Sequence, residues 1–461
     1  MEHLLDISLT ELAKLYRNTE VSPVEIVKAT FERQLKVEPQ LNAFISLTEK
    51  EALQQAKEAE KHFLRRESVH ILTGIPFSAK DLFYTKDIRT TCASNILRNF
   101  KPDFTATAIK KLLENGAVMI GKNNMLEFAY GVVHPDFGKT NNPWDLSKTS
   151  GGSSSGSVAA VASGIGFFSL GTDTGGSIRI PASYCGVVGL KPTRGLVSTH
   201  GVFPLSQSLD HAGPIARNAL DAALVIETIS GCDSEDPYSL AGKITAVDIE
   251  NFYASINKRI GILPERQLGG LTPDVRSVYK NTLKHVQSLG WEIEEITIPG
   301  WSQTEDIIMN VLLPEAAQIH KQWLDRKKEY ATMTYHQIEM GMEKKAVDYL
   351  DGLLSLKKYT EDVTRLFKSI DFLLLPTVAF AAPAEDPVIG SSEEDEMVFT
   401  GPFNISGHPA VTINMGFTEN GLPVGMQLVA PHFRDIELLQ AAAQLEHLRA
   451  VKLPPLIGKG V

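Results

Sequence analysis

A dense run of Gly, Ser and Ala, TSGGSSSGSVAAVASG at residues 149–164, constrains this chain more than any other stretch. A flexible linker contains nothing that can pack, but here Val158, Val161 and Ile165 recur at helical spacing. The alanines between them favour a helix over coil. We therefore expect a Gly/Ser turn that opens a tightly packed helix, with free backbone N–H groups at its start.

A second Gly-rich turn, TDTGGSIR at residues 172–179, follows this helix and places Ser177 24 residues after Ser153. Glycines before a serine let the backbone turn sharply and its N–H groups converge, as an oxyanion hole requires. A phosphate-binding loop would need Gly-Lys-Ser/Thr after its glycines, and GIGFFSLG lacks the G-x-G-x-x-G spacing. The two turns therefore favour a serine site over nucleotide binding.

Helical and strand patterns alternate along much of the chain. ATAIKKLLENGAVMIGK is typical of a helix closed by Gly116 and followed by a strand at 117–121, and PDVRSVYKNTLKHVQSLGWEIEEITI repeats this design with Gly290. The short apolar segments KRIGIL, DFLLLPT, AVTINMG and PVGMQLVA lie between helices. This alternation predicts an α/β layered fold around a largely buried sheet.

Charge and cysteine content exclude several classes of protein. The formal net charge of −10 gives no reason to expect a nucleic acid or an anionic membrane as partner. The three cysteines, Cys92, Cys185 and Cys232, are scattered, so neither a disulfide framework nor a thiolate zinc site is indicated. The N-terminus, MEHLLDISLTELAKLY, lacks the apolar core of a signal peptide. We expect a cytoplasmic protein.

Several segments together resemble the amidase signature family of serine hydrolases. GGSSSGSVAAVASGIGFFSLGTDTGGSIRIPASYCGVVGLKPT is similar to the signature stretch, and LTGIPFSAKDLF is similar to the family's lysine segment. Other shared blocks are IGKNNMLEFAYG, TNNPWD, SLDHAGPIAR and GLPVGMQLVAP, so the resemblance spans about residues 8–448. It implies a single α/β/α layered domain with a mixed, mostly parallel central sheet and helices on both faces.

Within one domain over residues 1–461, the resemblance implies four regions. These are N-terminal helices at 1–66, a catalytic core at 71–300, a variable helical segment near the pocket at 303–368, and a C-terminal return to the sheet at 369–461.

The resemblance also implies a Ser–Ser–Lys triad formed by Ser177, Ser153 and Lys80. A serine hydroxyl is a poor nucleophile until a base takes its proton. A lysine amine can act as that base only where burial keeps it neutral. Ser153 both donates and accepts hydrogen bonds, so it can pass the proton from the nucleophile Ser177 to the base Lys80.

The residues around Ser177 receive supporting roles from the same resemblance. The backbone N–H groups of Thr174, Gly175 and Gly176 would hold the oxyanion of the tetrahedral intermediate. Three further side chains would hold the loops in place: Asp173, Arg179 and Ser154. Asp173 and Arg179 would do so through charge-assisted hydrogen bonds. The sequence carries no HExxH motif, and we expect neither a metal nor a cofactor.

The substrate prediction rests on a comparison with one branch of the family, the A subunit of the tRNA-dependent amidotransferase. That subunit takes ammonia from glutamine. In that branch an arginine and an aspartate hold the α-amino-acid end of glutamine. Leu356 and Met397 fall at these positions without gaps, although a short gap would bring Arg365 or Glu396 closer. An apolar pair cannot hold a zwitterion.

We therefore expect a free-standing amidase that hydrolyses a small carboxamide or an aryl or alkyl amide to a carboxylic acid and ammonia or an amine. The alternatives are the amidotransferase A subunit, acting with partner subunits, and a relative that hydrolyses a urea, carbamate or ester. The partner is then a small-molecule amide, with a homodimer possible. The predicted pocket wall consists of Met125, Phe128, Tyr130 and Phe403.

Overall fold

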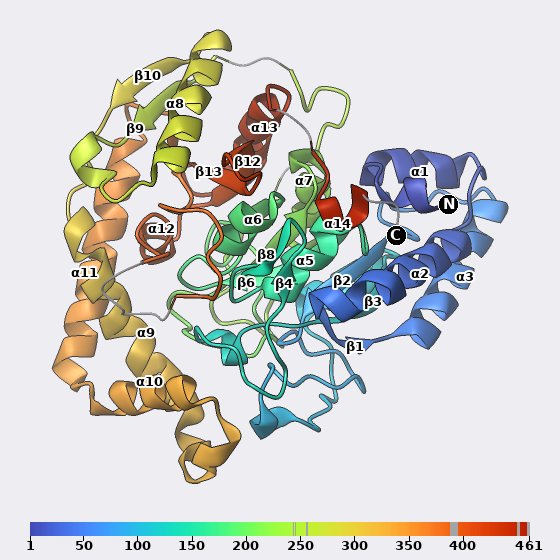
Figure 1. Ribbon diagram of the computed structural model, residues 1–461, viewed down its shortest axis with the longest axis horizontal. Coiled ribbons are helices and arrows are strands. Elements are labelled where there is room, and N and C mark those ends of the chain that lie inside the picture. The colour runs from blue at the N-terminus through green and yellow to red at the C-terminus, as the bar shows by residue number, and fades with distance from the viewer. Residues whose placement is uncertain (243, 245, 255–256, 388–394, 450–451, 459–461) are drawn as a thin grey trace.

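A central eleven-stranded sheet organises the computed structural model, which describes residues 1–461 except 243, 245, 255–256, 388–394, 450–451 and 459–461 (Figure 1). The strand order is β1-β3-β2-β6-β8-β7-β12-β13-β11-β9-β10, and β4 and β5 form a separate hairpin. The strands are β1 (Phe44–Leu47), β2 (Pro76–Lys80), β3 (Val118–Asn123), β4 (Asn141–Asn142), β5 (Asp145–Thr149), β6 (Phe168–Asp173), β7 (Val188–Lys191), β8 (His211–Ala216), β9 (Arg259–Ile262), β10 (Glu292–Glu295), β11 (Phe372–Pro376), β12 (Ala410–Phe417) and β13 (Pro423–Val429).

The sheet is mixed, as expected. Parallel pairs form two blocks, β3-β2-β6 and β11-β9-β10, and antiparallel pairs join these blocks through the centre. Antiparallel pairs are more numerous than expected: among the described residues they make up six of the ten pairs in this sheet. An antiparallel pair such as β12 and β13 needs only a short connection, whereas a parallel pair needs a crossover.

Helices cover both faces of the sheet, which confirms the layered α/β fold. In β8, Ile215 packs among residues of α5 and α6, whereas Ala212 and Ala216 belong to the cluster that contains α7. Alternate residues of a strand point to opposite faces, so α5 and α6 lie on one side and α7 on the other. The helices are α1 (Leu9–Arg17), α2 (Pro23–Leu41), α3 (Glu49–Leu64), α4 (Thr107–Glu114), α5 (Ser155–Ala162), α6 (Arg179–Cys185), α7 (Ala219–Ile229), α8 (Pro273–Ser288), α9 (Thr304–His320), α10 (Thr332–Glu343), α11 (Ala346–Leu366), α12 (Gly401–Ser406), α13 (Asp435–Glu446) and α14 (Pro455–Gly458).

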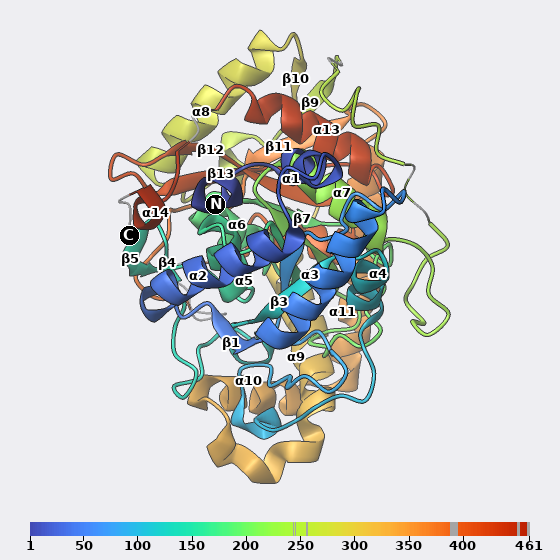
Figure 2. The same ribbon diagram turned by 90° about the vertical axis from the view of Figure 1, so that its right-hand side faces the viewer.

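The N-terminal region contains the expected helices and also one strand. Capping boxes begin α1 at Ser8 and α2 at Ser22, and α1–α3 lie together on the face turned toward the viewer in Figure 2. Helix α2 ends where Asn42 adopts a left-handed conformation. The next residues form β1, which pairs with β3 at the edge of the sheet. The region at 1–66 is therefore not purely helical.

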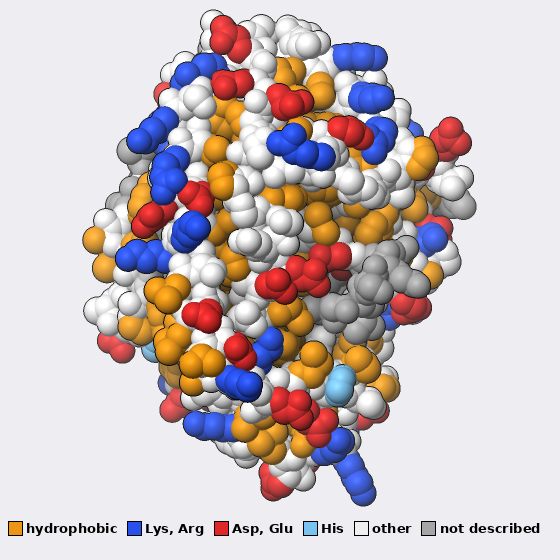
Figure 3. Space-filling view, turned by 90° about the vertical axis from the view of Figure 1, so that its left-hand side faces the viewer, with side chains coloured by type: hydrophobic (Ala, Val, Ile, Leu, Met, Phe, Trp, Pro, Cys, Tyr) orange, Lys and Arg blue, Asp and Glu red, His pale blue; other side chains and the backbone are white. Residues whose placement is uncertain are grey.

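The segment at 303–368 folds into α9, α10 and α11, which lie at one edge of the molecule (Figure 1). The described chain also contains short 3-10 helices: Glu2–Leu5, Asn95–Leu97, Glu127–Ala129, Glu265–Gln267, Trp301–Gln303 and Lys321–Glu329. The face that carries these three helices mixes hydrophobic side chains with charges of both signs (Figure 3). In the part of the chain that the structure describes, no helix has the length and apolar character needed to cross a membrane.

Candidate active site

The Gly/Ser run forms the predicted turn and opens α5. Gly151 has a φ of +83°, and a Cβ on it would lie 2.7 Å from Tyr184 Cδ2. A Cβ on Gly152 would overlap the side chain of Leu126. Only glycine therefore fits at these two positions, and the turn brings Ser153 against the end of β2.

Lys80 is the last residue of β2, and its side chain is fully buried. Its Nζ donates hydrogen bonds to Ser153 Oγ at 2.7 Å and to Thr172 Oγ1 at 2.9 Å. Burial lowers the pKa of Lys80 to about 7, although the carboxylates of Asp173 and Asp210 act in the opposite direction. A substantial fraction of this amine is therefore neutral near pH 7 and able to accept a proton.

Ser177 lies between β6 and α6, where it is half-buried and lines a cavity together with Ser153. The backbone N–H of Ser154 donates to the Ser177 carbonyl oxygen at 3.2 Å, and the Ser154 Oγ donates to the Thr172 carbonyl oxygen at 3.2 Å. These bonds join the two Gly-rich turns. The structure thus brings Lys80, Ser153 and Ser177 to one place.

The predicted oxyanion donors line the same cavity. In the described chain, the N–H groups of Thr174, Gly175 and Gly176 donate no hydrogen bond to protein atoms. Gly176 has a φ of +142°, and a Cβ there would collide with Thr400 Oγ1. This backbone has the free donors that an oxyanion site needs, and the role of the three residues stays a prediction.

Asp173 and Arg179 form a fully buried ion pair behind the loop. Arg179 donates from Nε to Asp173 Oδ2 at 2.9 Å and from Nη2 to Asp173 Oδ1 at 2.8 Å. Its Nη1 also donates to the Thr400 carbonyl oxygen at 3.0 Å and to Gln427 Oε1 at 2.6 Å. Burial would raise the pKa of Asp173, but the Arg179 guanidinium holds it well below its usual value. The pair therefore ties the Ser177 loop to the C-terminal part of the chain.

Arg179→Ala is expected to lower the free energy of unfolding by about 3–5 kcal/mol, because Asp173 would remain as a buried, unpaired charge. Urea denaturation at pH 7 measures this loss. The matched control is Arg434→Ala, because Arg434 is half exposed and pairs with Glu437 on the surface. The control should change the free energy of unfolding by at most about 1 kcal/mol. An equal, small effect of both variants would contradict a supporting role of the buried pair.

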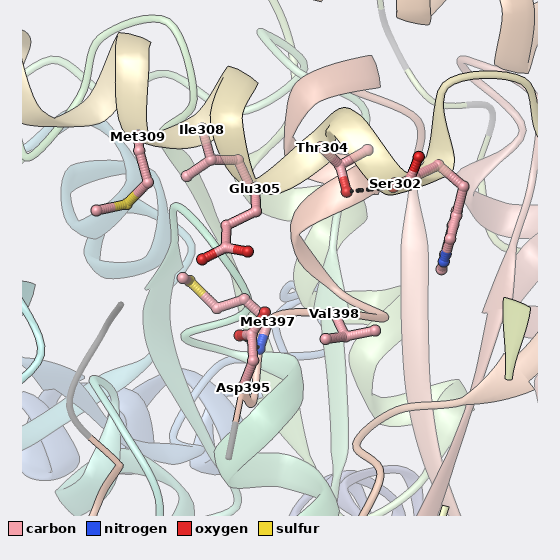
Figure 4. Close-up of a pocket in the computed structure, with 9 residues that line it drawn as sticks. Ser302, Thr304, Glu305, Ile308, Met309, Asp395, Met397 and Val398 are labelled. Carbon is pink, nitrogen blue, oxygen red and sulfur yellow. Dashed lines mark hydrogen bonds between the residues drawn. The ribbon is translucent and has the colours of Figure 1, made fainter. Parts of the chain in front are cut away.

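Two adjoining cavities lie at this site. The first, here named the Ser177 cavity, has a volume of about 40 Å³ and is lined by Leu126, Ala129, Gly131, Gly152, Ser153, Thr174, Gly175, Gly176, Ser177, Ile180, Leu205, Leu312, Asp386, Pro387, Glu396 and Met397. The second, here named the outer cavity, has a volume of about 230 Å³ and is lined by Trp301, Ser302, Thr304, Glu305, Ile308, Met309, Asp395, Met397 and Val398 (Figure 4). Among the described residues, no group of three or more His, Cys, Asp or Glu side chains is arranged to hold a metal ion.

The structure does not place the residues of the predicted pocket wall at either cavity. Met125, Phe128, Tyr130 and Phe403 are buried and line neither cavity. Large apolar side chains were expected at the wall, but here they fill the core: the Phe128 ring, for example, packs 4.5 Å from the ring of His320. Their neighbours in the chain line the Ser177 cavity instead, namely Leu126, Ala129 and Gly131.

Of the four residues considered above for glutamine recognition, two line the Ser177 cavity and two do not. Met397 and Glu396 line the Ser177 cavity. Leu356 is buried in α11, and Arg365 is exposed on the same helix beside Asp362, at 2.6 Å between Nη1 and Oδ1. Neither Leu356 nor Arg365 lines the cavity.

Three polar residues of the site were not predicted from the sequence. Thr172 accepts a hydrogen bond from Lys80, and its position in the second Gly-rich turn was a signal that could have indicated it. Asp210 accepts a hydrogen bond from Thr174 Oγ1 at 2.6 Å, and burial raises the pKa of Asp210 to about 6. Asp386 comes from a distant segment whose local sequence gives no such signal.

Comparison with known proteins identifies the family. The A subunit of the glutamyl-tRNA(Gln) amidotransferase of Geobacter sp. (strain M21) is 36% identical, over 96% of this chain and 97% of that protein. The crystal structure of an amidase superposes with a TM-score of 0.85 at 29% identity, covering 96% of this chain and 100% of the other. The amidotransferase A subunit from Thermotoga maritima superposes with a TM-score of 0.81 at 29% identity, covering 98% of each chain.

The similarity extends over nearly the whole length of the chain, and the sequence model of the amidase family matches residues 25–439. The predicted resemblance and the predicted fold are therefore confirmed. The chain belongs to the amidase signature family, whose enzymes act on the C–N bond of amides.

Proposed function

We propose that this protein hydrolyses small amides through an acyl-enzyme on Ser177. Neutral Lys80 takes a proton from Ser153 as Ser153 takes the proton of Ser177, and Ser177 Oγ attacks the amide carbon. The N–H groups of Thr174, Gly175 and Gly176 stabilise the oxyanion. The relay returns the proton to the leaving nitrogen, the C–N bond breaks, and ammonia or an amine departs. Water then attacks the acyl-enzyme by the same relay and releases the carboxylic acid.

One observation carries this proposal: a fully buried lysine with a pKa of about 7 donates a 2.7 Å hydrogen bond to Ser153 in the cavity that Ser177 lines. An ordinary lysine is protonated at pH 7 and cannot accept a proton. The burial of Lys80 removes that obstacle. The arrangement supplies a base and a proton carrier beside a half-buried hydroxyl.

The lining of the Ser177 cavity favours substrates without an anionic group. Asp386 and Glu396 contribute carboxyl groups, and no Lys, Arg or His of the described residues lines the cavity. Burial raises the pKa of Asp386 to about 6. The α-carboxylate of glutamine would find no counter-ion here and would lie near like charges. An uncharged carboxamide fits this lining better.

A second function, the A subunit of a glutamyl-tRNA(Gln) amidotransferase, is favoured over the first by the comparisons, because such subunits are 34–36% identical over nearly the whole chain. A subunit of a complex also needs a contact surface. Helices α10 and α11 expose a row of apolar side chains, each at least half exposed: Met342, Val347, Leu350 and Leu354. Such rows often mark protein contacts.

Product release by the purified chain distinguishes the two functions, with ammonia or amine measured for the nitrogen-containing substrates and alcohol measured for the ester. The panel contains propionamide, benzamide, an anilide, glutamine, a urea derivative, a carbamate and an ester, each with the wild type and with Ser177→Ala. Serine-dependent turnover of uncharged amides by the chain alone supports the first function. Activity on glutamine only, or activity that requires the other amidotransferase subunits, supports the second. Turnover restricted to the urea, carbamate or ester would contradict both.

The rate of hydrolysis is expected to rise with pH and to reach half of its plateau near pH 7. The lysine pKa of about 7 marks the point where half of the Lys80 amines are neutral. Below it the protonated amine cannot accept the proton, so kcat/KM falls about tenfold per pH unit. A pH–rate profile with an uncharged amide measures this limb. A profile that stays flat between pH 5 and 8 would contradict Lys80 as the base.

A further inference from the structure

The Ser177 cavity and the outer cavity share a single residue among those described, Met397. On one side of Met397 lies the Ser177 loop, and on the other side lies α9, which contributes Glu305 and Ile308 to the outer cavity. Figure 4 shows the Met397 side chain extending toward α9, where both of these side chains project toward it. The side chain of Met397 therefore stands at the boundary between the two spaces.

Met397 is in close contact with the loop that holds the predicted oxyanion donors. A Cβ built on Gly175 would lie 2.5 Å from Met397 Sδ and 3.5 Å from its Cγ, so the thioether packs directly over this glycine. The Gly175 carbonyl oxygen accepts a hydrogen bond from Thr400 Oγ1 at 2.6 Å. The loop and Met397 thus form one wall beside Ser177.

The backbone of Met397 is held from both directions. Its N–H donates to Asp395 Oδ1 at 2.8 Å, and its carbonyl oxygen accepts from the N–H groups of Thr400 at 3.1 Å and Gly401 at 2.8 Å. The second pair of bonds anchors Met397 to the start of α12. Since these bonds hold the backbone, the flexible side chain is the part of Met397 that can change position between the two cavities.

We propose that Met397 determines substrate length by separating the Ser177 cavity from a partly apolar extension site for longer acyl chains. The Ser177 cavity, at about 40 Å³, has room for about three water-sized groups. The outer cavity is larger, and its lining combines the apolar side chains of Trp301, Ile308, Met309 and Val398 with the polar side chains of Ser302, Thr304, Glu305 and Asp395. Truncation of Met397 joins the two, so that an unbranched alkyl amide too long for the first cavity extends into the second. This inference rests on the proposed function of the site.

The test compares kcat/KM for propionamide and hexanamide in the wild type, Met397→Ala, Met397→Leu and Met415→Ala. Met397→Ala is expected to raise the ratio of hexanamide to propionamide by about tenfold or more, the usual effect of added methylene groups in an apolar pocket. Met397→Leu keeps the volume of the wall and should leave the ratio within about threefold of the wild type. Met415 is buried in β12 and lines neither cavity, so Met415→Ala controls for a general loss of packing.

An unchanged ratio in Met397→Ala, or an equal change in Met415→Ala, would overturn the proposal. A parallel measurement separates this outcome from a failure of the proposed function. Calorimetric binding of hexanamide and propionamide to Ser177→Ala and to the double variant Ser177→Ala/Met397→Ala requires no turnover. Tighter binding of hexanamide in the double variant alone supports the wall at Met397 even where the wild type hydrolyses neither amide, and equal binding in both variants contradicts it.

Discussion

Ser177→Ala is expected to abolish amide hydrolysis, with kcat reduced by roughly 10⁴-fold or more, as is typical when a nucleophilic serine is removed. The half-buried Ser177 lines the cavity and is tied to Ser154 through its backbone rather than its hydroxyl. Loss of the hydroxyl should therefore change the free energy of unfolding by at most about 0.5 kcal/mol. Ammonia release and urea denaturation of the same preparation measure both quantities.

The matched control is Ser163→Ala. Ser163 lies at the C-terminal end of α5, whereas Ser153 lies just before its N-terminal end. The Ser163 hydroxyl is buried and has no hydrogen-bond partner among the described residues, so its removal should leave turnover at the wild-type rate. Turnover retained by Ser177→Ala would remove Ser177 from the role of nucleophile. A large loss in both variants would indicate that any serine near α5 affects the site through packing.

Lys80→Ala is expected to lower kcat by about 10²- to 10⁴-fold, the usual contribution of a general base. Without the amine, Ser153 has no group to which it can pass the proton of Ser177. The remaining rate should lose the pH dependence near pH 7, because the group whose pKa is about 7 is gone. Single-turnover rates between pH 5 and 9 measure both effects.

Two further variants distinguish a base from a structural role of Lys80. Lys80→Arg keeps a positive charge but cannot accept a proton near pH 7, so it should be as inactive as Lys80→Ala. Added ethylamine should partly restore Lys80→Ala, because the substitution leaves space where the Nζ hydrogen bonds to Ser153 and Thr172 were made. A loss of only a few-fold in Lys80→Ala, with the pH dependence intact, would mean that another base acts.

Local sequence patterns predicted many of the elements. The helix–glycine–strand units appear as α4 with β3 and α8 with β10, and Gly116 and Gly290 adopt positive φ as expected for glycines that end helices. The apolar segments between helices became β9, β11, β12 and β13. The strand β1 was missed because four residues between two strong helices carry too little periodicity to be distinguished from a loop.

The pocket was not predictable in the same way. Met125 and Phe128 were predicted to line the pocket, but whether a large apolar side chain faces the core or a cavity depends on neighbours from other segments. Met397, Asp386 and Leu312 reach the Ser177 cavity from three places far from Ser177 in the sequence. No local pattern encodes these contacts.

The sequence by itself indicated the layered fold, through its alternation of helix and strand patterns, and the family and the groups predicted near Ser177, through the resemblance of its Gly/Ser, lysine and other segments. Only the tertiary structure decided the environment of those groups. The burial of Lys80 beside Ser153 and Thr172, the bonds of Arg179 to Thr400 and Gln427, and the contact of Met397 with Gly175 each join segments that lie far apart in the sequence. Burial and electrostatics depend on all surrounding atoms, and those atoms come together only on folding.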